Sequence, residues 1–213
     1  MDDKMYCFQC EQTAGGKGCT GAAGVCGKKA DTAGLQDELT GAMIALSRAA
    51  KEGGRTDNAD NLILEGLFTC ITNVNFNNDT LLRLIGRLHE EIASLTVSAG
   101  GCSGCCGSCG SCGSIAEEPA DEDQFADYDM NKVWYANQDI RSLKSLILFG
   151  LRGMAAYAYH ARVLGYQDEA VNMFFYKALY AIGQDWGMEE LLPIVMETGK
   201  VNLACMELLD KAN

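Results

Sequence analysis

The sequence has little of what marks several common classes of protein. Among its 213 residues are 2 prolines and 2 histidines, and 17 lysines and arginines stand against 29 acids, giving a formal net charge of −12. Because phosphate groups are bound through clusters of lysine and arginine, this balance argues against a nucleic-acid partner. No apolar run reaches the roughly 18 residues of a membrane span, so we expect no membrane partner. The residues Met1 to Lys4 lack the basic and apolar parts of a secretory signal, and we therefore expect a cytoplasmic protein.

Cysteine, by contrast, is abundant, with eleven residues. In a reducing compartment this content favours metal binding, and an odd number leaves one thiol outside any complete set of disulfides. The first four follow the spacing C-x2-C-x8-C-x6-C among glycines and are Cys7, Cys10, Cys19 and Cys26. A zinc site usually pairs two short C-x2-4-C motifs, whereas a cubane cluster needs four thiolates around a compact body. The spacing favours an iron–sulfur cubane, with zinc or a disulfide knot as the alternative.

A second group of thiols lies at 98–114, a segment made of glycine, serine, cysteine and one alanine. Its cysteines are Cys102, Cys105, Cys106, Cys109 and Cys112. The last three have the C-x2-C-x2-C spacing of bacterial ferredoxins, so we predict a second iron–sulfur cluster of unknown nuclearity. The alternative is a flexible linker with incidental thiols. The acidic stretch 117–129 that follows is expected to be a solvated loop, with docking of a basic redox partner as the alternative.

The two remaining thiols, Cys70 and Cys205, lie on the apolar faces of expected helices. One interpretation makes them small buried hydrophobic residues, as free cysteine often is. The other makes them ligands of the second cluster, together with thiols of the 102–112 loop. Both interpretations stay open at the level of the sequence.

The remainder of the chain has helical periodicity. Apolar residues recur three and four positions apart in six stretches, roughly 31–53, 57–74, 81–95, 139–164, 168–182 and 188–209. With no convincing strand, we expect an all-α fold of two three-helix bundles with an N-terminal Cys/Gly-rich cluster-binding loop. The corresponding domains are a loop at 1–30, a bundle at 31–98, a Cys-rich then acidic loop at 99–136, and a bundle at 137–213.

Several local features refine this outline. Asp57 and Asp139 are expected to be helix N-caps. Pro193 favours a late start of the last helix, near Leu192, because the missing N–H of proline costs little in a first turn. The segment 133–135, Val-Trp-Tyr, is expected to anchor the chain onto the core after the acidic loop.

Met-Tyr-Cys-Phe-Gln-Cys-Glu-Gln-Thr at 5–13, with Gly-Cys-Thr at 18–20 and Gly-Val-Cys-Gly-Lys at 24–28, resembles the N-terminus of hybrid-cluster (prismane) proteins. Further similar segments cover nearly the whole chain except about 99–135, and lie at 67–76, 139–143, 150–157 and 208–213. That family comprises hydroxylamine and nitric oxide reductases related to carbon monoxide dehydrogenase. The resemblance implies that the first four cysteines ligate a proximal [4Fe–4S] cluster, [2Fe–2S] in some members. It also implies the family's helical domain, a pair of three-helix bundles.

The sequence also departs from the family pattern. The family's hybrid cluster is bound by His, Glu and Cys residues of two later α/β domains, and none of these ligands has a counterpart here. The resemblance therefore implies no hydroxylamine-reducing activity for this chain alone. The thiol loop at 102–112 is not expected in the family, nor are the thiols of Cys70 and Cys205, where threonine or alanine is expected.

Together these features indicate an iron–sulfur protein that carries electrons to or from a redox partner protein, with homodimerisation as a further option. One alternative is a redox enzyme acting on a small nitrogenous or other small molecule at an unusual second cluster. A second alternative is a metal- or redox-sensing module. Whether the chain is an enzyme is left open at this stage; if it is one, we expect an oxidoreductase.

Overall fold

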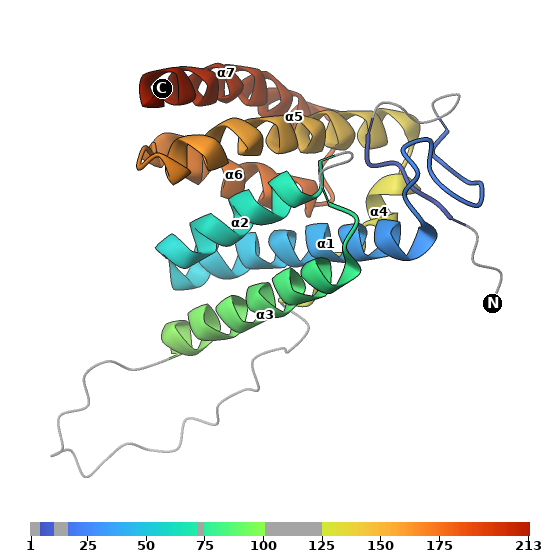
Figure 1. Ribbon diagram of the computed structural model, residues 1–213, viewed down its shortest axis with the longest axis horizontal. Helices are drawn as coiled ribbons and strands as arrows, with labels where there is room; N and C mark the ends of the chain where they lie inside the picture. Colours follow the sequence, from blue (N-terminus) through green and yellow to red (C-terminus); the bar gives the residue numbers. More distant parts are fainter. Residues whose placement is uncertain (1–4, 11–16, 72–74, 101–124) are drawn as a thin grey trace, which may run out of the picture.

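The computed structural model describes residues 5–10, 17–71, 75–100 and 125–213 (Figure 1). The helices in this part of the chain are α1 (Ala30–Gly53), α2 (Asp57–Thr69), α3 (Asn78–Gly100), α4 (Asn131–Trp134), α5 (Gln138–Val163), α6 (Glu169–Ile182) and α7 (Met188–Ala212). Within the described residues a single β-bridge is the only extended pairing, so the expected all-α fold is confirmed. No helix of these ranges is both long and apolar enough to cross a membrane.

The helices form two groups of three, as the sequence predicts. In the first group α1 packs along α3 and also contacts α2, and in the second α5 packs along α7 and also contacts α6. The two groups are joined because α2 packs on α5 and α1 packs on α6. One continuous core results, with fully buried side chains from both groups, including Leu39, Leu67, Leu88, Leu151, Phe175 and Leu191.

Hydrogen bonds at the helix starts correct three of the sequence-based expectations. Thr56 caps α2 by accepting from the N–H of Ala59 (2.9 Å), so Asp57 is the first helical residue rather than the cap. Asn137 caps α5 in the same way, two positions before the expected cap at Asp139. The late start of the last helix is also wrong. Gly187 N–H donates to the Glu190 carboxylate (3.0 Å), and α7 begins at Met188 with its proline in the second turn.

The segment 133–135 is anchored as expected through Val133 and Trp134, although Tyr135 is 69% exposed, and the described end of the acidic stretch is anchored as well. Trp134, in the short helix α4, is fully buried, and the backbone of Tyr128 lies directly on α1. A β-carbon at Gly41 would lie 2.3 Å from the Tyr128 carbonyl oxygen, so only glycine permits this approach. The sequence-based outline missed α4, because four residues are too short to show a helical period.

A buried carboxylate ties the two helix groups together. Asp60 of α2 is 5% exposed, and its two oxygens accept hydrogen bonds from the Arg55 guanidinium (3.2 and 3.0 Å). The same oxygens accept from two side chains of α6, the Asn172 amide (3.1 Å) and the Tyr176 hydroxyl (2.8 Å). The link between α2 and α6 is therefore polar as well as apolar.

Candidate metal centre

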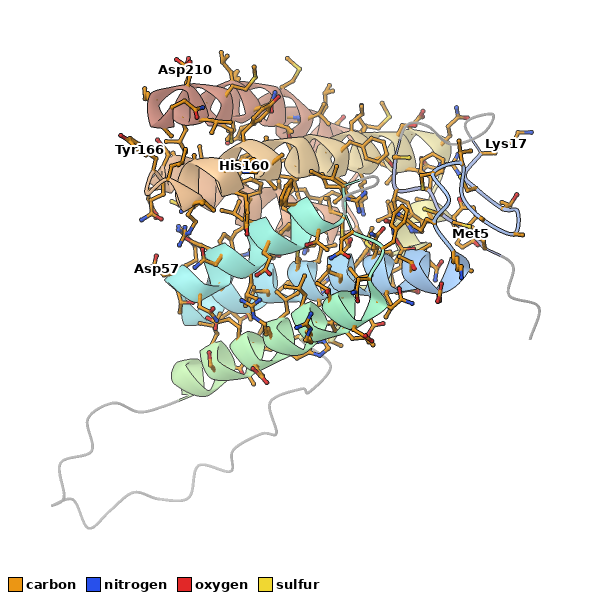
Figure 2. All side chains as sticks on the ribbon, in the orientation of Figure 1. Met5, Lys17, Asp57, His160, Tyr166 and Asp210 are labelled. Carbon is orange, nitrogen blue, oxygen red and sulfur yellow. The ribbon has the colours of Figure 1, made fainter. Side chains whose placement is uncertain are left out.

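The N-terminal cysteines lie in a loop at one end of the helix layers. Figure 2 shows Met5 and Lys17 at this end, with Asp57, Tyr166 and Asp210 at the other. Cys7 and Cys19 face each other in an antiparallel bridge: Cys7 N–H donates to the Cys19 carbonyl oxygen (3.0 Å), and Cys19 N–H donates to that of Cys7 (2.8 Å). Directly opposed residues of such a pair point their side chains to the same face. The bridge therefore places these two thiols side by side.

Three glycines shape the loop, one at the bridge between Cys7 and Cys19 and two in the turn that follows. Gly18 has a φ of +84°, and a β-carbon there would lie 3.2 Å from the Cys7 carbonyl oxygen. In the second turn Gly27 N–H donates to the Gly24 carbonyl oxygen (2.8 Å). A β-carbon at Gly24 would lie 3.5 Å from Cys26 Sγ, so this thiol sits against the turn. Glycine therefore permits the close turns of the backbone at these positions.

All four thiols of the loop are free, with Cys7 and Cys19 buried and Cys10 and Cys26 partly exposed. Burial raises the pKa of the Cys7 thiol, and the positive charge of Lys28 opposes that rise. Within the described ranges no three His, Cys, Asp or Glu side chains gather closely enough to hold a single metal ion. The fit to an iron–sulfur cluster rests on the donor set, four thiols on a short glycine-rich loop, which is the ligand chemistry such clusters use.

A layer of buried polar side chains lies between this loop and α1. The Gln9 amide nitrogen donates to the Ala33 carbonyl oxygen (3.1 Å) and to Asp37 Oδ1 (2.6 Å). Lys28 is 3% exposed, and its ammonium donates to Gln9 Oε1 (3.3 Å) and to the side-chain oxygen of Gln36. Side chains from both ends of the loop are thereby fixed to the first helix.

The acid of this layer is Asp37, on α1. Its second oxygen accepts from the Trp134 indole N–H (3.2 Å), which ties α4 to the loop layer. Burial raises the pKa of Asp37 to about 6, although hydrogen bonds from Gln9 and Trp134 act in the opposite direction.

Helix α5 reaches the same layer through Arg152, which is 4% exposed. Its Nη1 donates to the Gln9 carbonyl oxygen (2.5 Å), between the first two cysteines, and its Nη2 to the Thr40 hydroxyl (3.5 Å). Its Nε has no hydrogen-bond partner among the described atoms. The cysteine loop is thus held by both helix groups.

Comparisons with known proteins give the family of the chain. The Prismane/CO dehydrogenase family matches residues 5–213. The chain belongs to this family. Among its relatives are hydroxylamine reductases of Desulfitobacterium hafniense (39% identical over 98% of this chain), Methanocella arvoryzae (38% over 98%) and Porphyromonas gingivalis strain W83 (37% over 100%). The chain spans 39%, 40% and 40% of their respective lengths, so this prismane-family chain corresponds to about two fifths of each relative.

In this prismane-family chain Cys70 belongs to the surroundings of the cysteine loop. It is buried at the C-terminal end of α2, with its Sγ 3.9 Å from the Gln36 carbonyl oxygen. Burial raises the pKa of its thiol, while Arg152 and Lys28 act in the opposite direction. Cys70 and Cys10 also line one pocket of about 360 Å³ with Arg152.

Cys205 has different surroundings. It is fully buried in α7, and burial together with the charge of Asp168 raises the pKa of its thiol to about 12. Asp168 follows shortly after Tyr166, at the end of the molecule opposite the cysteine loop (Figure 2). The structure therefore places Cys70 and Cys205 at different ends. The thiols of the 102–112 loop lie outside the described residues, so the second cluster stays a prediction.

Cysteine spacing gives no sign of the polar layer, which consists of Gln9, Lys28, Gln36, Asp37 and Arg152. The signal that could have revealed it is polarity within apolar stripes. Gln36 and Thr40, one turn apart, directly follow Leu35 and Leu39 of the α1 stripe, and both are buried. Buried polar groups need partners, so such positions indicate a polar layer inside the fold.

Proposed function

We propose that this prismane-family chain binds a [4Fe–4S] cluster through Cys7, Cys10, Cys19 and Cys26 and serves as an electron carrier. The observation that carries the proposal is the loop itself. Backbone pairing sets two of its thiols side by side, its glycines allow the tight turns, and all four thiols are free. The cluster, when bound, supplies one-electron redox chemistry.

The chain's own residues would give such a cluster one protected and one accessible side. Cys7 and Cys19 are buried, and Met5 and Ala33 pack against them. Cys10 and Cys26 are partly exposed, so electrons can exchange with a docked protein on that side. The net charge of −12 favours a redox partner with a basic docking surface. A cytoplasmic location belongs to this proposal, because thiolate ligands need a compartment that keeps cysteine reduced.

The test is anaerobic preparation of the full chain, with iron and sulfide analysis and visible absorption. We expect iron and sulfide in equal amounts and a charge-transfer band that bleaches on reduction. Cys19→Ser is expected to lose iron from this site. Cys205→Ser, at the other end of the molecule, is the matched control and is expected to keep it. A wild-type chain without iron or visible absorption would contradict the proposal.

The predicted second cluster needs its own variant. Replacing Cys106, Cys109 and Cys112 together by serine is expected to lower the iron content while the absorption of the first site remains. Unchanged iron and sulfide would refute a second cluster in this loop. If zinc or copper binds the loop reversibly instead, the sensing alternative gains support.

A second candidate function, reduction of hydroxylamine, is favoured by the names of the relatives. Because the chain spans about two fifths of each, we propose that it supplies electrons and that turnover needs the regions outside the match. Cluster-loaded protein assayed with a reduced viologen dye and hydroxylamine is then expected to show no turnover. Turnover by this chain alone would place the reducing site here and favour the second-cluster enzyme.

A further inference from the structure

Two buried cations lie under the cysteine loop, and neither has an ion-pair partner in the part of the chain that the structure describes. Lys28 and Arg152 are 3% and 4% exposed. Their hydrogen-bond acceptors are uncharged: the amide oxygens of Gln9 and Gln36, the Gln9 carbonyl and the Thr40 hydroxyl. Within the described ranges no carboxylate oxygen comes within 4.0 Å of either cation.

This arrangement leaves an excess of buried positive charge. A buried cation is strongly unfavourable unless an opposite charge lies nearby, and for that reason buried charges are normally paired. Asp37 is the acid on which both cations act, and it offers at most one negative charge against two positive ones. Burial also disfavours its ionised form. Counted over the described residues, the layer therefore lacks at least one negative charge.

The loop above the layer is where the missing anion fits. Lys28 acts electrostatically on the Cys7 thiol, and Arg152 holds the carbonyl oxygen of the residue just before Cys10. Arg152 and Cys10 also line the same pocket of about 360 Å³. Four thiolates around an iron–sulfur core leave a net anion, whose negative charge grows by one on one-electron reduction. Bound by these thiols, such an anion would lie next to both cations and would supply the charge that the described residues of the layer lack.

We propose that Lys28 and Arg152 are the built-in counter-charges of the cluster and raise its reduction potential. Reduction adds one electron and no other group, so two fixed positive charges stabilise the reduced cluster more than the oxidised one. This inference rests on the proposed function. The Gln9 side chain and backbone join the two cations, because Lys28 donates to the first and Arg152 to the second. Lys28 and Arg152 are positioning and tuning residues, since neither is a ligand of the cluster.

The test is a redox titration of the cluster-loaded full chain, monitored by electron paramagnetic resonance, with iron and sulfide measured for every variant. Lys28→Met and Arg152→Gln are each expected to shift the reduced-to-oxidised ratio at a fixed potential at least tenfold toward the oxidised form. For a one-electron couple this equals a fall in midpoint potential of about 59 mV. Arg152→Lys keeps the charge and is expected to retain most of the wild-type potential.

Lys177→Gln is the matched control, because it removes one positive charge from an exposed pair with Glu197. Its potential is expected to stay at the wild-type value. Loaded Lys28→Met and Arg152→Gln variants with wild-type potentials would overturn the inference while leaving the cluster proposal intact. A wild-type chain that binds no iron would instead defeat the proposed function itself.

A variant that fails to bind the cluster is also informative. If Lys28→Met binds no iron, Lys28→Arg decides the matter, because it restores the charge in a different shape. Recovery of iron with a potential near wild type supports the role of the charge. A Lys28→Arg protein that binds iron no better than Lys28→Met shows that the shape of lysine matters instead, and this overturns the inference.

Discussion

The buried carboxylate of Asp60 allows a quantitative test of how the two helix groups are joined. In Asp60→Asn the volume is kept, so no cavity forms, but the charge and the acceptor capacity of one oxygen are lost. Whichever oxygen is replaced, one hydrogen bond from Arg55 and one from α6 are lost. The donor on α6 is buried, so it stays without a partner and the full cost of its lost hydrogen bond falls on the folded state. Arg55 is 22% exposed, so water replaces part of its lost hydrogen bond. We expect the free energy of unfolding to fall by about 2–4 kcal/mol.

For a chain of this length, that loss corresponds to a fall in melting temperature of about 5–15 °C. Urea unfolding followed by circular dichroism, with calorimetry as the second method, measures both quantities. Glu169→Gln is the matched control. It removes the other carboxylate that Arg55 contacts, but this side chain is 73% exposed, and no resolvable loss of stability is expected. A loss below about 1 kcal/mol for Asp60→Asn would refute the reasoning, because it would mean that the buried donors find other partners.

Three further predictions follow from local geometry. Gly41→Ala is expected to destabilise the protein, because its β-carbon would meet a backbone oxygen at 2.3 Å. A β-carbon at Gly34, on the same helix, would meet nothing, so Gly34→Ala is expected to stabilise the protein by about 0.5–1 kcal/mol. Thermal unfolding compares the two variants. In the cluster-free chain the raised pKa of Asp37, about 6 against 3.8, gives stability that is present below pH 3.8 and lost as the pH rises through about 6. The wild type should therefore lose stability over that window relative to Asp37→Asn, and equal pH profiles would contradict this. Iodoacetamide should leave Cys205, with its thiol pKa near 12, unmodified in the folded cluster-free protein while Cys10 reacts; mass spectrometry of the labelled peptides decides.

The sequence predicts the parts of the fold that depend on periodic burial. The α1 stripe through Leu39 and Leu46 is fully buried in the structure, and the pairing of helices into two groups follows from the short connections. Prediction from the sequence fails where a single local contact sets the first residue of a helix. Thr56 and Asn137 are examples, because their capping hydrogen bonds shift the helix starts. At Pro193 a general preference is overridden by the capping of α7 at Gly187.

In the candidate site, too, the sequence predicts some residues and misses others. Ligand spacing is a property of the local sequence, and for that reason it singles out the N-terminal cysteines as one group. The layer beneath them joins residues far apart in the chain, such as Gln9 and Arg152, and no local pattern records that pairing. A buried cation also has the same sequence signature as an exposed one. Only the hydrogen bond from Arg152 to the Gln9 carbonyl shows that this cation of α5 belongs to the surroundings of the cysteine loop.

The contact between Arg152 and the Gln9 carbonyl has a consequence for the order of events during synthesis. The two residues are 143 positions apart, so the cysteine loop leaves the ribosome well before the helix that holds it. At about 5–20 residues per second, the delay is roughly 7–30 s. During that interval the thiols are in solution without the cation from α5 and without the cover of the second helix group. For the proposed cluster, insertion into its final environment is therefore a late step, which follows the emergence of α5 rather than that of the cysteines.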